Sequence, residues 1–151
     1  TWSKFPAYEK AKEIIKSIKN NQVNLIIWGT GWGKTVLVPK FALHAFNYNK
    51  KIAVTLPKKI ITKSAAEYGA ITLDVKLGQQ VGYVYKGDRK MSWNTKLLYA
   101  TDGWIVWMLQ KDPEIKDYDV IIIDEAHERK VQIDLLLFLM KNAISLRKDL
   151  R

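Results

Sequence analysis

The sequence contains no cysteine, which excludes disulfide bonds and metal sites built from thiolates. It also contains no run of about 18 uncharged apolar residues, so we expect no membrane-spanning helix. The N-terminal stretch carries several lysines and has no uninterrupted apolar core, which does not fit a secretory signal. Together these absences predict an intracellular protein without a membrane partner, in a compartment that the sequence does not specify.

Acidic residues are scarce relative to basic ones. The 25 lysines and arginines exceed the 15 aspartates and glutamates, which gives a formal net charge of +10. Such a charge on a small domain favours a polyanionic partner such as nucleic acid, although basic charge can also serve solubility alone. Lysine greatly outnumbers arginine, so few side chains can recognise a base through paired hydrogen bonds.

No internal repeat, low-complexity segment or linker interrupts the 151 residues, a length that suits one domain. Short apolar runs alternate with amphipathic stretches, a pattern typical of a parallel sheet with crossover helices. The predicted strands are 23–29, 50–57, 80–85, 95–101 and 119–124. The predicted helices are 7–21, 34–45, 58–70, 102–111 and 131–146, with a polar turn at 86–94. We therefore expect a three-layer α/β domain with a mostly parallel sheet and helices on both faces.

A glycine-rich stretch, WGTGWGKT at 28–35, follows the first predicted strand and opens a predicted helix. In a phosphate-binding loop, backbone N–H groups surround phosphate oxygens, a lysine reaches the β- and γ-phosphates, and a hydroxyl binds Mg²⁺. Lys34 and Thr35 hold those last two positions, while Trp28 replaces the expected first glycine. A tight strand-to-helix turn without a ligand is the alternative. The residues expected to bind the nucleotide here are Gly29, Thr30, Gly31, Trp32, Gly33, Lys34 and Thr35.

A second motif, YDVIIIDEAHER at 118–129, ends an apolar strand with acidic residues. Asp124 at the strand end can hold Mg²⁺ through its waters, opposite Thr35. Glu125 follows in the same metal site, where it can orient and deprotonate the attacking water. His127 is interpreted as a coupling residue, although alone it could be a core histidine. A capped strand is the alternative for the acidic pair, but its combination with the glycine-rich loop favours an ATPase that uses ATP and Mg²⁺.

With both motifs present, the chain resembles the DEAH-box (DEAH/RHA) helicases of superfamily 2 over almost its whole length. TLPKK at 55–59, LGQQVGY at 77–83, YATDG at 99–103 and DEAHERKVQID at 124–134 are similar to motifs of that family. The resemblance implies the first of two RecA-like motor domains, an N-terminal ATP-binding domain over residues 1–151. It also implies that the third family motif and the second motor domain lie outside this chain, and that the strand before that motif lies beside strand 119–124.

The resemblance also implies roles for individual residues. Lys34 would hold phosphate, Glu125 would be the catalytic base, and His127 would relay the nucleotide state to other motifs. Thr35 and Asp124 would share Mg²⁺. The residues placed along the nucleic-acid strand are Pro57, Lys58, Lys59, Thr101 and Asp102, and Tyr68 is placed where it could stack on adenine. Without the resemblance, the two lysines could equally be a solvated surface.

Tryptophan is where the chain departs most from the family pattern. Trp107 stands where the family usually has an arginine, and Trp28 and Trp32 lie in the phosphate loop. Trp104 and Trp107 are three residues apart and share one helix face. We expect packing in the core or at its rim for most of these indoles, in preference to contact with bases.

The function that these patterns favour is an ATP-dependent helicase or translocase, directed by resemblance at single-stranded RNA in the 3′-to-5′ direction. It would act with a second RecA-like domain of the same polypeptide, and the segment alone would hydrolyse little ATP because it lacks a stabiliser of transition-state charge in trans. One alternative is a degenerate helicase that clamps nucleic acid, which Trp28 and Trp32 favour. Another is a different P-loop ATPase, such as an AAA+ remodeller, against which TDG at 101–103 argues.

Overall fold

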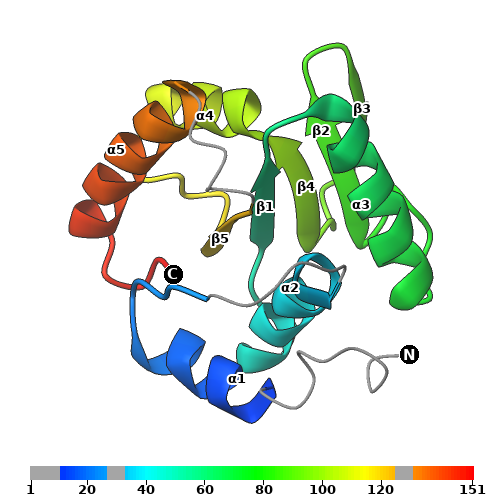
Figure 1. Cartoon of the computed structure of the whole chain (residues 1–151), viewed down its shortest axis with the longest axis horizontal. Coiled ribbons are helices and arrows are strands. Elements are labelled where there is room, and N and C mark those ends of the chain that lie inside the picture. The colour runs from blue at the N-terminus through cyan, green and yellow to red at the C-terminus, as the bar shows by residue number, and fades with distance from the viewer. Residues whose placement is uncertain (1–10, 27–32, 125–130) are drawn as a thin grey trace.

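The computed structural model describes residues 11–26, 33–124 and 131–151, without the side chains at 33, 34, 36, 131 and 132. Ten elements follow one another through these ranges (Figure 1). The helices are α1 (Ala11–Asn20), α2 (Gly33–Ala45), α3 (Lys59–Thr72), α4 (Asp102–Lys111) and α5 (Val131–Leu146). The strands are β1 (Ile52–Leu56), β2 (Val81–Tyr85), β3 (Asp88–Lys90), β4 (Leu97–Thr101) and β5 (Val120–Ile123).

The strands form one sheet in the order β3-β2-β4-β1-β5. Strands β2, β4, β1 and β5 run parallel, with Ile52 of β1 opposite Leu97 of β4 on one side and Val120 of β5 on the other. Strand β3 pairs antiparallel with β2 through a tight hairpin. Because the parallel strands share one direction, the loops after β1, β4 and β5 reach the same edge of the sheet.

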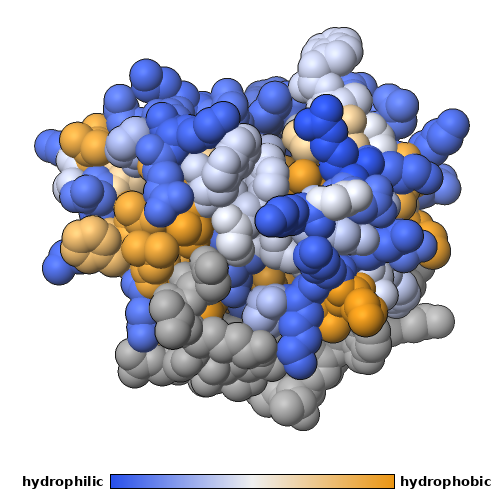
Figure 2. Space-filling model, turned by 90° about the horizontal axis from the view of Figure 1, so that it is seen from above, coloured by the Kyte–Doolittle hydropathy of each residue, from blue (hydrophilic) through white to orange (hydrophobic). Residues whose placement is uncertain are grey.

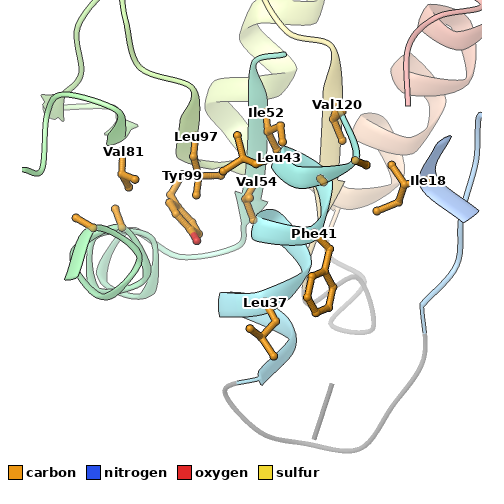
Figure 3. Close-up of a cluster of buried hydrophobic side chains, with 14 of the residues drawn as sticks. Ile18, Leu37, Phe41, Leu43, Ile52, Val54, Val81, Leu97, Tyr99 and Val120 are labelled. Carbon is orange, nitrogen blue, oxygen red and sulfur yellow. The ribbon is translucent and has the colours of Figure 1, made fainter. Parts of the chain in front are cut away.

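Alternating side chains divide the interior into two layers, one on each face of the sheet. One face of β1, with Ile52, Val54 and Leu56, packs with α1, α2 and α3, and the other face, with Ala53, packs with α4 and α5. Figure 3 shows the first layer, where side chains from α2 and α1 gather against those of the strands. The predicted three-layer α/β fold is confirmed, and the arrangement agrees with a RecA-like domain.

Helices α3 and α4 begin within one residue of the predicted starts, shortly after the carboxyl ends of β1 and β4. Helix α3 begins directly after Lys58, and α4 begins directly after Thr101; both preceding residues have extended backbone. Helices α4 and α5 match the predicted ranges 102–111 and 131–146 residue for residue. Over the ranges that the structure describes, no helix is long and apolar enough to cross a membrane.

The structure corrects two predictions. The predicted strand at 23–29 is absent from its described part, residues 23–26, where Val23 and Leu25 are 68% and 84% exposed. Apolar sequence alone does not make a strand, since its backbone groups must pair with a neighbour, and none of the described strands pairs with 23–26. The predicted polar turn at 86–94 contains β3, whose three residues are all exposed, so no apolar alternation announced it.

Candidate nucleotide and nucleic-acid site

Thr35 and Asp124 come together at the carboxyl edge of the sheet. The hydroxyl of Thr35, in the first turn of α2, donates a hydrogen bond of 2.8 Å to Oδ2 of Asp124. Asp124 directly follows β5 and is buried, and its backbone N–H donates to the Thr55 carbonyl at 3.1 Å, which continues the β1–β5 pairing. The structure thus brings two predicted magnesium ligands into direct contact from distant parts of the chain.

Tyr99 lies beneath this pair in the middle of β4. It is fully buried, and its hydroxyl donates a long hydrogen bond of 3.4 Å to the backbone carbonyl of Thr35. Burial, helped by the negative charge of Asp124, raises the pKa of Tyr99 above its ordinary value, so the phenol stays protonated. The sequence interpretation did not single out Tyr99, although it opens the YATDG motif.

Gly69 of α3 explains how the helix approaches this tyrosine. A Cβ added at Gly69 would lie 3.2 Å from the Tyr99 ring and 3.2 Å from its hydroxyl oxygen. The neighbouring residue Tyr68, which was predicted to stack on adenine, lies on α3 and is 37% exposed. Its ring is therefore partly accessible on a helix that also packs against α2.

Thr55 links β1 to the start of α4. Its hydroxyl donates a hydrogen bond of 2.7 Å to Oδ1 of Asp102, and both side chains are buried. Asp102 was predicted to lie along a nucleic-acid strand, but its carboxylate lies beneath the surface and accepts from inside the sheet. Its position suits a role in fixing the ends of β1 and β4, because a buried carboxylate needs donors around it.

The other residues predicted to follow a nucleic-acid strand lie at the carboxyl ends of β1 and β4. Lys58 and Lys59 are exposed where α3 begins, and Pro57 and Thr101 are half-buried beside them. Figure 2 looks onto this edge of the sheet and shows mostly hydrophilic side chains there. The edge therefore combines exposed ammonium groups with the helix starts that follow parallel strands.

The β2–β3 hairpin adds aromatic rings to this edge. Tyr83 and Tyr85 stack with centroids 5.7 Å apart, and their hydroxyls donate to Oδ2 of Asp88 at 2.8 and 3.4 Å. Burial and the Asp88 hydrogen bond raise the pKa of Tyr83 to about 12, and the hydrogen bond from Tyr83 lowers the pKa of Asp88. The ammonium of Lys59 lies 5.7 Å from the Tyr85 centroid, and that of Lys63 lies 5.8 Å from the Tyr83 centroid.

Several predicted site residues lie outside the described residues. Glu125 and His127 are among them, as are Gly29, Thr30, Gly31 and Trp32 of the glycine-rich loop. Gly33 and Lys34 open α2, but their side chains are not described. In the described part of the chain, no three acidic, histidine or cysteine side chains form a cluster that could hold a metal ion. Thr35 and Asp124 are the predicted magnesium ligands whose side chains the structure describes.

Known proteins that are similar in sequence to this chain point to one family. Residues 8–142 match the sequence model of the DEAD/DEAH box helicase family. Protein L540 of Acanthamoeba polyphaga mimivirus, whose name carries the words ATP-dependent RNA helicase, is 46% identical over 145 residues, 95% of this chain and 21% of that protein. The ATP-dependent RNA helicase HrpA of Borreliella burgdorferi is 42% identical over 149 residues, 98% of this chain and 18% of that protein. The chain thus spans about a fifth of the length of these curated relatives.

Proposed function

The chain belongs to the DEAD/DEAH box helicase family, and from this premise we propose that it is the ATP-binding motor domain of an RNA-directed helicase. The observation that carries the proposal is the hydrogen bond between Thr35 and Asp124. It joins the helix after the glycine-rich loop to the strand before DEAH, which is where a nucleotide-hydrolysing domain needs both. Relatives named as ATP-dependent RNA helicases support ATP and RNA as the ligands.

The residues at this point fit a magnesium ion. Mg²⁺ prefers hard oxygen ligands, binds few protein groups and keeps several of its waters. The Thr35 hydroxyl and the Asp124 carboxylate supply two such oxygens, 2.8 Å apart, at the start of a helix and the end of a strand. A bound ion would neutralise charge on the phosphate oxygens of the nucleotide.

The remaining nucleotide roles follow the family motifs. Lys34 would bind the β- and γ-phosphates together with the loop residues Gly29, Thr30, Gly31, Trp32 and Gly33. Glu125 would orient the attacking water and accept its proton, and His127 would couple the nucleotide to the rest of the motor. Tyr68 would contact the adenine from α3. Tyr99 would hold α2 against the sheet through its bond to the Thr35 carbonyl.

A nucleic-acid strand would pass over the carboxyl ends of β1 and β4. Lys58 and Lys59 are exposed there and can bind phosphates, and Thr101 lies at the start of α4. Thr55 connects this region to the nucleotide side, since its carbonyl accepts the N–H of Asp124 and its hydroxyl binds Asp102. Movement of Asp124 on nucleotide binding would therefore reach the nucleic-acid side through Thr55.

We propose further that a third-motif strand and a second RecA-like domain of the same polypeptide complete the motor. The outer edge of β5 supports the strand: the Ile121 N–H donates to the Arg151 carbonyl at 2.8 Å, and the Arg151 N–H donates to the Asp119 backbone carbonyl at 3.0 Å. These bonds direct the chain along β5, and the Arg151 side chain donates to the Ile18 carbonyl at 3.1 Å, close in sequence to residues 23–26. A strand inserted there would give residues 23–26 the backbone partner that they lack among the described residues.

The test is hydrolysis and unwinding by the full-length protein. We expect single-stranded RNA to raise the rate of phosphate release, and Glu125→Gln to abolish hydrolysis while ATP binding persists, because the amide cannot accept a proton. Unchanged hydrolysis by Glu125→Gln would exclude Glu125 as the base. Lack of Mg²⁺-dependent ATP binding by the wild-type protein would instead favour a nucleic-acid clamp without ATPase activity.

A further inference from the structure

A groove of about 1050 Å³ lies at the carboxyl edge of the sheet, on the side away from the Thr35–Asp124 pair. The β2–β3 hairpin, the start of α4 and the ends of β1 and β4 form its walls, so it adjoins the proposed path of the strand. The phosphate contacts proposed above use lysines and do not account for the aromatic part of this lining. This aromatic lining consists of Tyr85, Trp104 and Trp107.

Two indoles form the α4 wall. The centroids of Trp104 and Trp107 are 6.2 Å apart with an angle of 42° between the rings. Trp104 is half-buried and packs against the apolar layer of α4 and α5, whereas Trp107 is 47% exposed. Trp104 therefore anchors the pair, and Trp107 presents an indole that the core does not use.

Tyr85, the last residue of β2, forms part of the hairpin wall. Tyr85 lines the groove, stacks on Tyr83, and shares with it the carboxylate of Asp88. The tight turn before Asp88 needs Gly87, whose φ of +106° lies in the left-handed region that favours glycine. The Tyr85 ring is thus held in place before any ligand binds, which lowers the entropy cost of binding to it.

Positive charge surrounds these rings. The ammonium of Lys111 lies 4.1 Å from the Trp107 centroid, and that of Lys59 lies 5.7 Å from the Tyr85 centroid. Lys86 and Arg89 are exposed on the hairpin and also line the groove. Rings flanked by cations complement a ligand that combines flat apolar faces with negative charge, and an apolar peptide would not use the cations.

We propose that this groove is a base-stacking subsite for single-stranded nucleic acid. The faces of one or two unpaired bases would contact Trp107 and Tyr85, while neighbouring phosphates would bind Lys59 and the hairpin cations. Paired bases hide their faces in the stack, so the subsite selects single strands. The inference rests on the proposed function and deepens it, because phosphate contacts detect a backbone and these rings detect the bases.

The test measures the affinity of the full-length protein for two fluorescent oligonucleotides: a single-stranded RNA, and a strand of equal length and charge with abasic sites in place of its central bases. The variants are Trp107→Ala, the conservative Trp107→Phe, and Trp93→Ala as a matched control. Trp93 is 87% exposed on the connection between β3 and β4 and does not line the groove. Melting curves check that each variant is folded.

We expect Trp107→Ala to weaken binding of the base-bearing RNA about tenfold, since one stacking contact is lost. Its affinity for the abasic strand and the salt dependence of binding stay at wild-type values, because the number of phosphate contacts is unchanged. Trp107→Phe retains most of the affinity, and Trp93→Ala has no effect.

Other results would overturn the inference in distinguishable ways. Equal loss on both strands, or no loss on either, would show that Trp107 does not contact bases, while the proposed function would stand. Intact binding of both strands together with loss of a protein partner would assign the groove to protein docking. Failure of the wild-type protein to bind either strand would overturn the proposed function and the subsite together.

Discussion

The nucleotide side and the groove side share one edge of the sheet but differ in chemistry. On the nucleotide side, the buried carboxylate of Asp124 accepts from Thr35. On the groove side, the exposed ring of Trp107 and the half-buried ring of Tyr85 lie beneath lysine ammonium groups. The first arrangement suits a cation held in a small space, and the second suits an extended polyanion with flat bases.

The difference explains how one sheet edge would hold the two negatively charged ligands that we propose, a nucleotide and a nucleic-acid strand, at separate places. A carboxylate repels phosphate unless a metal ion lies between them, whereas lysines attract phosphate directly. Thr55 lies between the two sides and connects them, because its carbonyl accepts the N–H of Asp124 and its hydroxyl donates to Asp102. The comparison can be tested by changing one side at a time.

The largest expected effect comes from removing the charge of Asp124. Asp124→Asn keeps an oxygen that can accept from Thr35, so the fold should persist while the attraction for Mg²⁺ is lost. We expect ATP hydrolysis by the full-length protein to fall about 100-fold, at the upper end for residues that hold a metal indirectly. Phosphate release at saturating ATP and RNA measures it. Asp117→Asn, at an exposed position before β5, should hydrolyse at the wild-type rate.

The pH dependence of stability should come from Lys40, a buried cation in the same helix as Thr35. Burial lowers the pKa of Lys40 to about 8. Between pH 8 and the ordinary lysine value of 10.5, the unfolded chain holds a proton that the folded chain has released, so stability rises with pH. Below about pH 8, Lys40 is protonated in both the folded and the unfolded chain, so the full cost of burying its charge lowers the stability of the fold.

Lys40→Met should therefore stabilise the fold at pH 7 by on the order of 2 kcal/mol. Its advantage over the wild type should shrink as the pH approaches 10. Urea unfolding at a series of pH values, followed by tryptophan fluorescence, measures both. A constant difference between the two proteins across this range would contradict the assigned pKa.

Breaking the link between the two sides should have the next largest effect. Thr55→Val keeps the shape of the side chain and removes the donor that binds Asp102 at 2.7 Å. We expect the free energy of unfolding to fall by about 2 kcal/mol, since a buried carboxylate loses a hydrogen bond. Thr55→Ser, which keeps the hydroxyl, should restore most of the stability. Equal stability of Thr55→Val and wild type would show that this bond does not stabilise the fold.

The smallest effects are expected from two glycines, Gly82 in β2 and Gly103 in α4. A Cβ at Gly82 would lie 2.4 Å from the Lys90 carbonyl oxygen, so Gly82→Ala should force the hairpin apart and cost about 1 kcal/mol. Gly103→Ala on α4 meets nothing within 4 Å and should stabilise slightly, because alanine favours a helix. Hydrogen exchange of the hairpin amides measures the opening of the hairpin in Gly82→Ala. Urea unfolding measures the change in the free energy of unfolding for both variants. A Gly82→Ala hairpin with wild-type protection would contradict the prediction.

Much of the fold was predictable because it depends on local patterns. Apolar runs bounded by polar residues located β1, β2, β4 and β5, and the family resemblance, now confirmed, identified the motifs. Strand β3 escaped prediction because all its residues are exposed, and residues 23–26 were predicted as a strand although they lack a described partner. A strand depends on its neighbour, which a local pattern does not contain.

The candidate site, like the fold, has a part that the sequence predicted and a part that only the tertiary structure shows. Residue types and spacing in the sequence alone indicated Thr35 and Asp124, since the chemistry of phosphate and magnesium limits which side chains can serve. Only the tertiary structure shows that the two touch, that Asp102 turns inward to Thr55, and that Tyr99 supports the helix of Thr35. Those facts depend on how distant strands pack, because a side chain's direction and burial are set by neighbours far away in the sequence.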